Sequence, residues 1–507
     1  MIPQHDVSPP FVSLRLVAME AGREKLELRL GDWIHRGSTY YLQLDPKAGK
    51  SKVDPDGADA RVSLTRLLEQ WRDAIAVAEV GKTFFLPFDF DDESTGWLRG
   101  RANGDAITFD VGWSELEGWK FLPSRISAAA QQVSDFDRRD DAPVITAPRA
   151  EWLRLVEASI DSASGTLVPR PVTDPTPLFE LFRGSYGTEL LTAAVAHFNL
   201  FGVLSERPLD FQDLGACLGL QSRPLAVLTT AMRAMGLLTL DDAGRLRLTA
   251  LAEEHLSPGG PLDVGDYIGL AAAAPGVLEM VERLRTNRPA SSGGGTAFIY
   301  RAGVASAMEQ SELARHFTMA LAGRAKNVAP HLARAVDLSE VNTILDVAGG
   351  TGIYSIAMLE RYPRLKAIVL DRPEVLKVAA EFADRYGVGD RLELLAADMF
   401  SAPWPQADAV LLSNVLHDWD VPTCQELLAK SRSALTPAGR VLIHDVFLND
   451  THDGPLAIAL YSAALFTLTE GRAYSVGEYR SWLASAGFEV EGPVPTLVHC
   501  GVMQGRL

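Results

Sequence analysis

From residue 343 to the C-terminus, apolar strand-like runs alternate with amphipathic helical stretches. The runs are TILDVAG, KAIVLD, RLELLAAD, DAVLLSNVL and GRVLIHDVFL. Strands that alternate with helices of about ten to fifteen residues predict parallel βαβ units. We therefore predict that residues 328–507 form a doubly wound, Rossmann-like α/β domain.

Titratable side chains stand at the predicted carboxyl ends of these strands. They are Asp346, Asp371, Asp398, His417 and Asp445. In doubly wound sheets, ligands bind beyond the carboxyl ends of the strands, where the strand order reverses. We expect these five residues to be the last of their strands and to line a ligand site.

The turn after the first strand reads Ala348-Gly-Gly-Thr-Gly352. It lacks the G-x-G-x-x-G spacing of a dinucleotide site and the Lys-Ser/Thr of a P-loop. Asp346 at its entrance suits an ammonium or sulfonium group, and Asp371 after the next strand could bind a ribose diol. A cation and a ribose without a phosphate describe S-adenosylmethionine. The alternative is a glycine-rich turn that serves packing alone.

Several motifs in order give residues 176–507 a resemblance to a known family. LDVAGGTG, LDRPEV, AADMF, LHDWD and GRAYSVGEYRSWLASAGF resemble segments of the small-molecule O-methyltransferases of the caffeic acid and hydroxyindole type. The resemblance implies a class I methyltransferase fold and S-adenosylmethionine as cofactor. It implies these contacts: Asp346, Gly350 and Gly352 at the methionine end, Asp371 at the ribose, and Asp398 with Met399 at the adenine.

Ala348 stands where this family usually has glycine. A methyl group is tolerable there if φ is negative, so we expect slight crowding of the cofactor and no loss of binding.

His417 resembles the catalytic base of the family. A phenol has a pKa of about 10 and is mostly neutral at pH 7, so a base with a pKa near 6.5 can assist its attack. Asp445, in the next predicted strand, could orient the imidazole and stabilise its charged form. The alternative is a capping or core histidine.

One position departs from the family pattern, because Ala473 replaces a second orienting glutamate. Glu470 could substitute for it, whereas Glu478 is expected to be a surface or capping acid. Either Asp445 suffices, or the reaction depends on proximity and the acceptor is already acidic, as in a polyketide-type hydroxyquinone.

Residues 176–327 are predicted to be helical, with a winged-helix-like pattern. The second helix of the pattern, 222–236, carries only Arg223 and Arg233 among apolar residues, which is too little charge for phosphate contacts. The resemblance implies a dimerisation domain instead, and the apolar stretch 178–204 is expected to belong to the interface of a homodimer.

Residues 1–135 resemble no family, and we predict a β-rich α+β domain of unknown role. Its predicted strands and one helix are the runs SLRLVAM, KLELRL, TYYLQLD, TFFLPFDF, GWLRGR, AITFDVGW and the helical SLTRLLEQWRDAIAVA. The polar, proline-rich stretch 136–175 is predicted to be a linker with one short helix.

Composition restricts the partners. The net charge of -17 argues against a nucleic-acid partner. Cys217, Cys424 and Cys500 lie far apart, without the spacing of a disulfide framework or a metal site, which favours a reducing compartment. No signal peptide or membrane span is expected, and we predict a cytoplasmic protein without a metal.

These observations predict a methyltransferase that methylates a hydroxyl of an aromatic small molecule, phenolic or polyketide-type, with S-adenosylmethionine. Two alternatives stay open. The acceptor atom could be nitrogen or carbon, or the fold could bind the cofactor as a non-methylating enzyme or scaffold.

Overall fold

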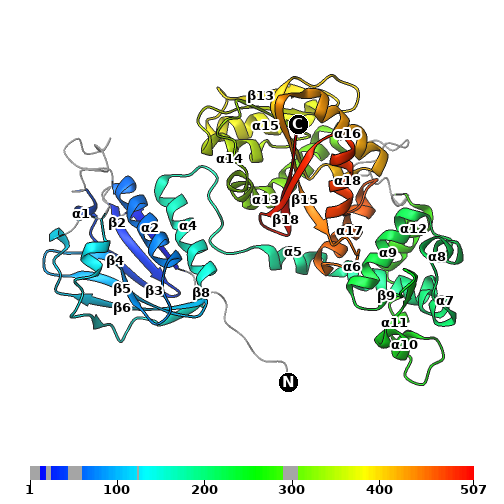
Figure 1. The fold of residues 1–507 in the computed structure, drawn as a ribbon, viewed down its shortest axis with the longest axis horizontal. Helices are drawn as coiled ribbons and strands as arrows, with labels where there is room; N and C mark the ends of the chain where they lie inside the picture. Colours follow the sequence, from blue (N-terminus) through cyan, green and yellow to red (C-terminus); the bar gives the residue numbers. More distant parts are fainter. Residues whose placement is uncertain (1–11, 19–23, 44–59, 121, 123–124, 289–306) are drawn as a thin grey trace. The chain divides into compact units, whose positions relative to one another are not determined.

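The computed structural model describes residues 12–18, 24–43, 60–120, 122, 125–288 and 307–507. By its internal contacts the chain divides into two units, Met1–Asp174 and Pro175–Leu507 (Figure 1). All the predicted site residues belong to the second unit.

The first unit contains two antiparallel sheets and two long helices that pack on each other. One sheet has the order β1 (Val12–Ala18), β2 (Glu24–Leu30), β3 (Trp33–Gly37). The other contains β4 (Thr83–Phe90), β5 (Thr95–Asn103), β6 (Ala106–Ser114), β7 (Asp137–Arg138) and β8 (Ile145–Pro148), the last two both paired with β6. The helices are α1 (Tyr40–Gln43), α2 (Ala60–Ala76), α3 (Ser127–Ala130), α4 (Arg149–Ser164) and a 3₁₀ turn at Gly118–Lys120. Every second side chain of β2 points to the same face of the sheet, so Leu26, Leu28 and Leu30 are all buried in the core that the sheets share with α2 and α4.

Two predictions for this unit are wrong. Residues 137–164 are not a linker, because β7 and β8 extend a sheet and α4 buries Trp152, whose Nε1 donates to the carbonyl of Ile107 at 2.9 Å. Pro148 is compatible with the sheet because it is the last residue of β8 and the N-cap of α4, where a missing N–H costs little. Residues 40–43 of the run TYYLQLD form α1 and not a strand; residues 44 and 45 lie outside the described ones.

The second unit begins with helices that carry the predicted helix–turn–helix and wing. They are α5 (Thr176–Arg183), α6 (Ser185–Thr192), a π-helical turn (Ala193–His197), α7 (Leu200–Glu206), α8 (Phe211–Leu218), α9 (Ser222–Ala234), α10 (Ala250–Leu256), α11 (Gly265–Gly269), α12 (Pro275–Thr286), a 3₁₀ turn (Ala307–Glu309) and α13 (Ser311–Ala335). The wing is the antiparallel pair β9 (Leu238–Leu240) and β10 (Leu246–Leu248).

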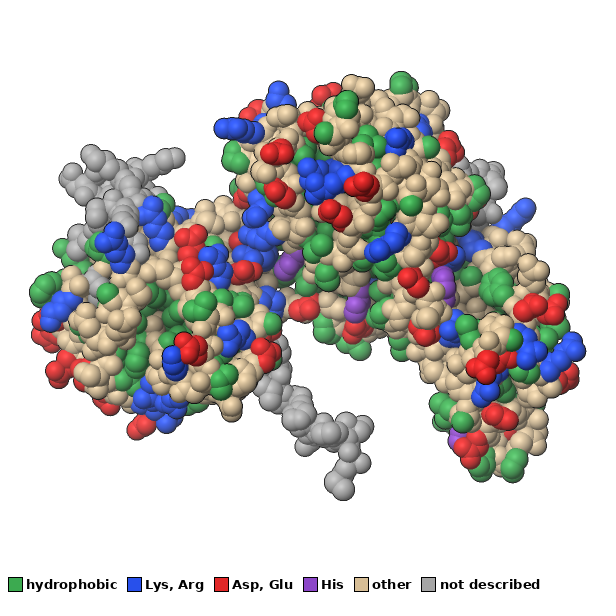
Figure 2. Space-filling model, in the orientation of Figure 1, with side chains coloured by type: hydrophobic (Ala, Val, Ile, Leu, Met, Phe, Trp, Pro, Cys, Tyr) green, Lys and Arg blue, Asp and Glu red, His purple; other side chains and the backbone are tan. Residues whose placement is uncertain are grey.

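Helix α9 packs against other helices of the same chain. Its apolar face belongs to a core that also contains Ala463 and Phe466 of α17 (Leu456–Leu468). Arg223 donates to the carbonyls of Thr469 and Gly471 at 2.8 and 3.0 Å. Figure 2 shows acidic and basic side chains interspersed over the visible face. The burial of α9 and the engagement of Arg223 both favour packing over phosphate contacts for this helix.

The α/β part forms one mixed sheet in the order β13-β12-β11-β14-β15-β18-β17, with β16 paired to β15 (Figure 1). Its strands are β11 (Thr343–Val347), β12 (Lys366–Asp371), β13 (Leu392–Ala396), β14 (Ala407–Ser413), β15 (Leu435–Leu448), β16 (Tyr474–Ser475), β17 (Glu489–Pro495) and β18 (Cys500–Arg506). Its remaining helices are α14 (Ile353–Arg361), α15 (Pro373–Tyr386), a 3₁₀ turn (Leu416–Asp418), α16 (Val421–Ala434) and α18 (Val476–Ser485). The first five strands are parallel, and β18 and β17 are antiparallel additions. The strand order reverses between β11 and β14, which places the expected ligand site there.

Among the described helices, none is by itself long and apolar enough to cross a membrane. The pair Thr176–His197 and Leu200–Glu206 meets that criterion only when taken together, with a bend of 58° between them.

Candidate active site

Asp346 lies on β11 directly before the glycine-rich turn and is fully buried. One carboxylate oxygen accepts a hydrogen bond from Ser355 Oγ at 2.7 Å, and the other, Oδ1, has no hydrogen-bond partner among the described residues. Burial raises the pKa of Asp346 to about 7, and the nearby Asp371 adds to the rise. A buried carboxyl group with a free oxygen is suited to a cationic ligand group.

The turn itself adopts a conformation that favours glycine at several positions. The φ angles of Ala348, Gly350 and Gly352 are +53°, +60° and +70°. A Cβ at Gly349 would lie 2.7 Å from the carboxyl carbon of Asp346, so a side chain there would displace the acid. The expectation of a negative φ at Ala348 is wrong, because its backbone N–H is held by the carbonyl of Leu370 at 2.8 Å in a left-handed turn.

Asp371 ends β12 and closes the turn from the other side. Its carboxylate accepts from the backbone N–H of Gly350 at 2.9 Å and of Arg372 at 2.7 Å. Burial raises its pKa to about 6, although both hydrogen bonds oppose the rise. The turn and the acid predicted to bind a ribose are therefore joined directly.

Asp398 and Met399 lie in the loop after β13, next to Asp371. The backbone N–H of Ala397 donates to the Asp371 carbonyl at 3.1 Å, and Asp398 accepts from the N–H of Phe400 at 2.9 Å. The Met399 carbonyl accepts from Trp404 Nε1 at 2.9 Å. These bonds bring together Asp371 and the loop that was predicted to contact the adenine.

Only Asp371 is the last residue of its strand, so the expected placement of the other four is wrong in detail. Asp346 is the penultimate residue of β11, and Asp398 follows β13 by two residues. His417 lies in the 3₁₀ turn after β14, and Asp445 lies within β15, which continues to Leu448.

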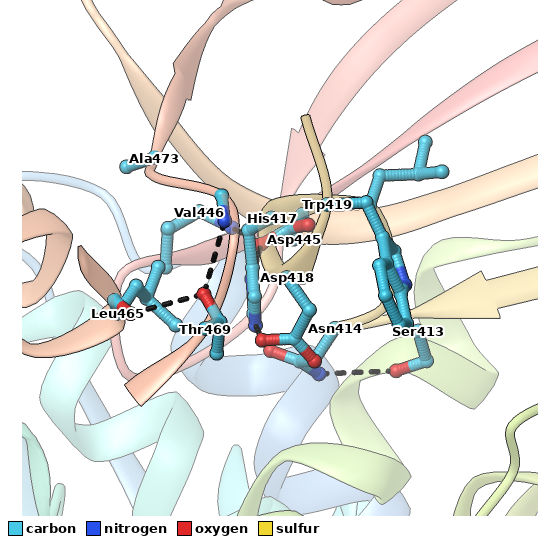
Figure 3. Close-up of polar contacts among 12 residues, drawn as sticks. Ser413, Asn414, His417, Asp418, Trp419, Asp445, Val446, Leu465, Thr469 and Ala473 are labelled. Atoms are coloured by element: carbon cyan, nitrogen blue, oxygen red, sulfur yellow. Dashed lines mark hydrogen bonds and ion pairs between the residues drawn. The ribbon is translucent and has the colours of Figure 1, made fainter. Parts of the chain in front are cut away.

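His417 and Asp445 form a buried pair. His417 Nδ1 lies 2.5 Å from Asp445 Oδ1, and the two side chains face each other in Figure 3. The carboxylate also accepts from the backbone N–H of Val446 at 2.8 Å and from the hydroxyl of Tyr479 at 2.9 Å. Because these donors fix the carboxylate, Nδ1 is held as the protonated nitrogen and Nε2 is left as the basic one.

The charges around the pair favour a basic imidazole. Burial alone would lower the pKa of His417, but the carboxylates of Asp445 and Asp418 outweigh it, so the pKa is raised above its usual value. The pKa of Asp445 is lowered, because the contacts with His417 and the hydrogen bonds overcome its burial. Asp418 Oδ1 lies 3.6 Å from His417 Nε2, and burial raises the pKa of Asp418 to about 7.

No second glutamate appears at the position of Ala473, which is buried and points away from the imidazole in Figure 3. Glu478 pairs with Arg472 and closes a capping box with Ser475 at the start of α18, as expected for a capping acid. Glu470 donates its backbone N–H to the Asp418 carbonyl at 3.1 Å.

Sequence reasoning did not assign Tyr479 or Asp418 to the site. Asp418 could have been found from its position directly after His417. The sequence around Tyr479 does not indicate a site residue, because the Tyr479 hydroxyl reaches Asp445 only through the packing of α18 against β15 and β16.

Comparisons with known proteins agree with this geometry. Residues 281–489 match the model of the O-methyltransferase domain. The 3-hydroxy-5-methyl-1-naphthoate 3-O-methyltransferase of Streptomyces sahachiroi is 36% identical over 64% of this chain and 93% of that protein. The tetracenomycin polyketide synthesis 8-O-methyl transferase of Streptomyces glaucescens is 29% identical over 62% and 92%.

A solved structure is similar over the same region. The O-methyltransferase family 2 protein of Planctomyces limnophilus, crystallised with apigenin, is 47% identical, with a TM-score of 0.61 over 67% of this chain and 98% of that one. Together with the buried His417–Asp445 pair and the glycine-rich turn flanked by acids, these matches show that the chain belongs to the S-adenosylmethionine-dependent O-methyltransferase family.

Proposed function

We propose that the protein methylates a hydroxyl group of an aromatic small molecule, with His417 as general base and Asp445 as its positioning partner. The observation that carries this proposal is the buried 2.5 Å contact between His417 Nδ1 and Asp445, which leaves Nε2 as the proton acceptor. The acceptors named for the relatives, a hydroxynaphthoate and a tetracenomycin intermediate, support an aromatic, polyketide-type acceptor.

The residues around the turn fit S-adenosylmethionine, which supplies an electrophilic methyl group on its sulfonium when bound. The free oxygen of Asp346 suits the ammonium group of the methionine part, with Gly350 and Gly352 leaving room for close backbone approach. Asp371 is suited to the ribose diol. Asp398 and Met399, on the adjoining loop, would hold the adenine.

The proton of the acceptor goes to His417. When the hydroxyl oxygen bonds to the methyl group and the C–S bond breaks to leave a thioether, Nε2 would take the hydroxyl proton and the imidazole would become cationic. The carboxylate of Asp445 stabilises that cation, and its own charge is held by Val446 and Tyr479. The raised pKa of His417 strengthens it as a base near neutral pH.

We also propose a homodimer and a division of labour along the chain, with residues 176–327 forming the dimer and 328–507 binding the cofactor. Much of the apolar stretch 190–204 is used in the chain's own core. Leu178, Leu181 and Phe182 of α5 remain exposed, by 69%, 79% and 80%. Side chains of this size are covered in most proteins, so α5 supports an interface with a second copy.

A labelling experiment tests the proposed reaction. The full-length protein is incubated with methyl-labelled S-adenosylmethionine and matched naphthols, hydroxyquinones, hydroxyindoles and aromatic amines, and the product is mapped by mass spectrometry and NMR. We expect the label on an aromatic oxygen. Label on nitrogen or carbon, or S-adenosylhomocysteine binding without any transfer, would contradict the proposal.

A further inference from the structure

Two arginines face the ring of Tyr461, which lies beside His417. Tyr461 is on α17, Arg183 on α5 and Arg324 on α13. The guanidinium carbons of Arg183 and Arg324 lie 3.7 and 5.6 Å from the centre of the Tyr461 ring. That ring contacts His417 edge-on, with 5.7 Å between the ring centres. Both positive charges are thus one aromatic ring away from the imidazole.

Neither arginine has an acidic partner among the described residues. Arg183 is 7% exposed, and its contacts there are the rings of Tyr461 and Phe179. Arg324 donates to Asn414 Oδ1 at 2.9 Å and to Cys500 Sγ at 2.7 Å, while its Nε is buried without a partner.

The neighbouring groups favour the charge of Arg324, whose pKa is raised because Cys500, two tyrosines and Asp445 outweigh its burial, but none of them forms an ion pair with it. Burial raises the pKa of the Cys500 thiol although Arg324 lies beside it, so the sulfur is neutral at neutral pH. The nearby Asp445 is engaged by His417, Val446 and Tyr479.

A buried guanidinium group, that of Arg183, and a half-buried one, that of Arg324, are costly in a ligand-free protein when no carboxylate pairs with them. A buried charge needs a counter-charge, and the guanidinium fork matches a carboxylate better than any other common small anion except phosphate. Burial lowers the pKa of Arg183, and the like charge of Arg324 contributes to this shift. The pair is therefore complementary to an anionic group that arrives with a ligand.

We propose that Arg183 and Arg324 bind a carboxylate on the methyl acceptor, so that the acceptor is a hydroxylated aromatic acid. This inference rests on the proposed methylation of an aromatic hydroxyl. Such an acceptor would present its hydroxyl to His417 and its carboxylate to the two arginines. Arg324 also opposes the charging of His417, and a bound carboxylate reduces that opposition and makes the base stronger.

The other source of a carboxylate is the methionine part of the cofactor, and binding measurements distinguish the two. The full-length protein is first saturated with S-adenosylhomocysteine. Calorimetry then measures the affinity for 3-hydroxy-1-naphthoate and for its carboxamide, which has the same shape without the charge. Methyl transfer to both compounds is measured separately.

We expect the acid to bind at least about 10-fold more tightly than the amide, because charge-assisted hydrogen bonds to arginine are strong. Arg183→Gln and Arg324→Gln should each weaken binding of the acid by about 10- to 100-fold and leave the amide within threefold. Arg324→Lys should restore part of the preference. Arg285→Gln is the matched control, because Arg285 lies over the ring of Phe198 at 5.6 Å but is exposed.

Equal affinity for acid and amide in the wild-type protein would overturn the proposal. A loss of S-adenosylhomocysteine binding in Arg324→Gln would also overturn it, because the arginine would then bind the cofactor. Selective binding of the acid without methyl transfer would uphold the anion site and refute the proposed reaction.

Discussion

At the scale of single residues, the proposed function depends on how Asp445 is held. Its carboxylate has three donors, so a change at any one of them alters the basicity of His417. The family's second orienting glutamate is absent at Ala473, and in the proposed mechanism Tyr479 helps to fix the base through Asp445 and not through the imidazole.

Asp445→Asn and Tyr479→Phe should shift the pH dependence of kcat in opposite directions. The Asp445 carboxylate raises the pKa of His417, so Asp445→Asn should lower that pKa. The part of the pH profile in which kcat rises with pH, its ascending limb, should then move to lower pH. The loss of kcat in Asp445→Asn should be smaller than that of His417→Ala. Tyr479→Phe removes a donor from the carboxylate, which then attracts the imidazolium proton more strongly. The limb should move to higher pH by less than about one unit.

Stopped-flow or steady-state profiles between pH 5.5 and 9 measure both shifts. Movement of both limbs in the same direction would refute the positioning role of Asp445.

Ala348→Gly should stabilise the second unit. Alanine at a φ of +53° is strained, and replacing a left-handed alanine by glycine gains about 1 kcal/mol after the greater freedom of the unfolded chain is counted. Calorimetry of the ligand-free protein should show a raised Tm and unchanged affinity for S-adenosylhomocysteine. A lower Tm would mean that the methyl group contributes more by packing than it costs in strain.

At the scale of elements, we expect the β11–α14 turn to couple cofactor binding to a proton. With a pKa of about 7, Asp346 is partly protonated in the free protein, and a bound cation favours its charged form. Affinity for S-adenosylhomocysteine should therefore rise with pH up to about 7 and then level off, with proton release on binding.

Calorimetry in buffers of different ionisation enthalpy checks this prediction. Asp346→Asn should bind more weakly and lose most of the pH dependence, whereas Asp371→Asn should bind more weakly and keep a pH dependence that is shifted to lower pH, because Asp371 contributes to the raised pKa of Asp346. Without ligand, the raised pKa of Asp346 makes wild-type stability fall as pH rises from about 4 to about 7, and Asp346→Asn should leave only the smaller fall, ending near pH 6, that the raised pKa of Asp371 causes. A flat affinity profile in the wild-type protein would show that Asp346 does not face the cation.

The elements also show what a single sequence can and cannot predict. β12 ends at Asp371 as predicted, because Pro373 begins the next helix and marks the boundary locally. β15 runs past Asp445 because β16 and β18 pair with it, and those pairings come from distant sequence. The φ of Ala348, the hydroxyl of Tyr479 on Asp445 and the approach of Arg183 to Tyr461 likewise depend on tertiary packing.

At the scale of the whole molecule, the methyltransferase matches extend over about two thirds of the chain. The proposed dimer makes a direct prediction. Light scattering of the full-length protein at micromolar concentration should give about twice the chain mass of 54.9 kDa.

Leu181→Glu combined with Phe182→Glu should give a monomer, since two charges at an apolar interface would be buried without partners. Retained S-adenosylhomocysteine binding shows that the variant is folded. A wild-type protein of 54.9 kDa would contradict the dimer.

The proposed mechanism requires that the second unit place one basic nitrogen, His417 Nε2, against an acceptor hydroxyl. The most direct test is kcat of His417→Ala at saturating S-adenosylmethionine, measured across pH beside its affinity for S-adenosylhomocysteine. We predict a fall of about 10²-fold or more, loss of the ascending limb and nearly unchanged cofactor affinity. A variant that stays within threefold of wild type, with a profile that follows the acceptor's own pKa, would contradict base catalysis by His417.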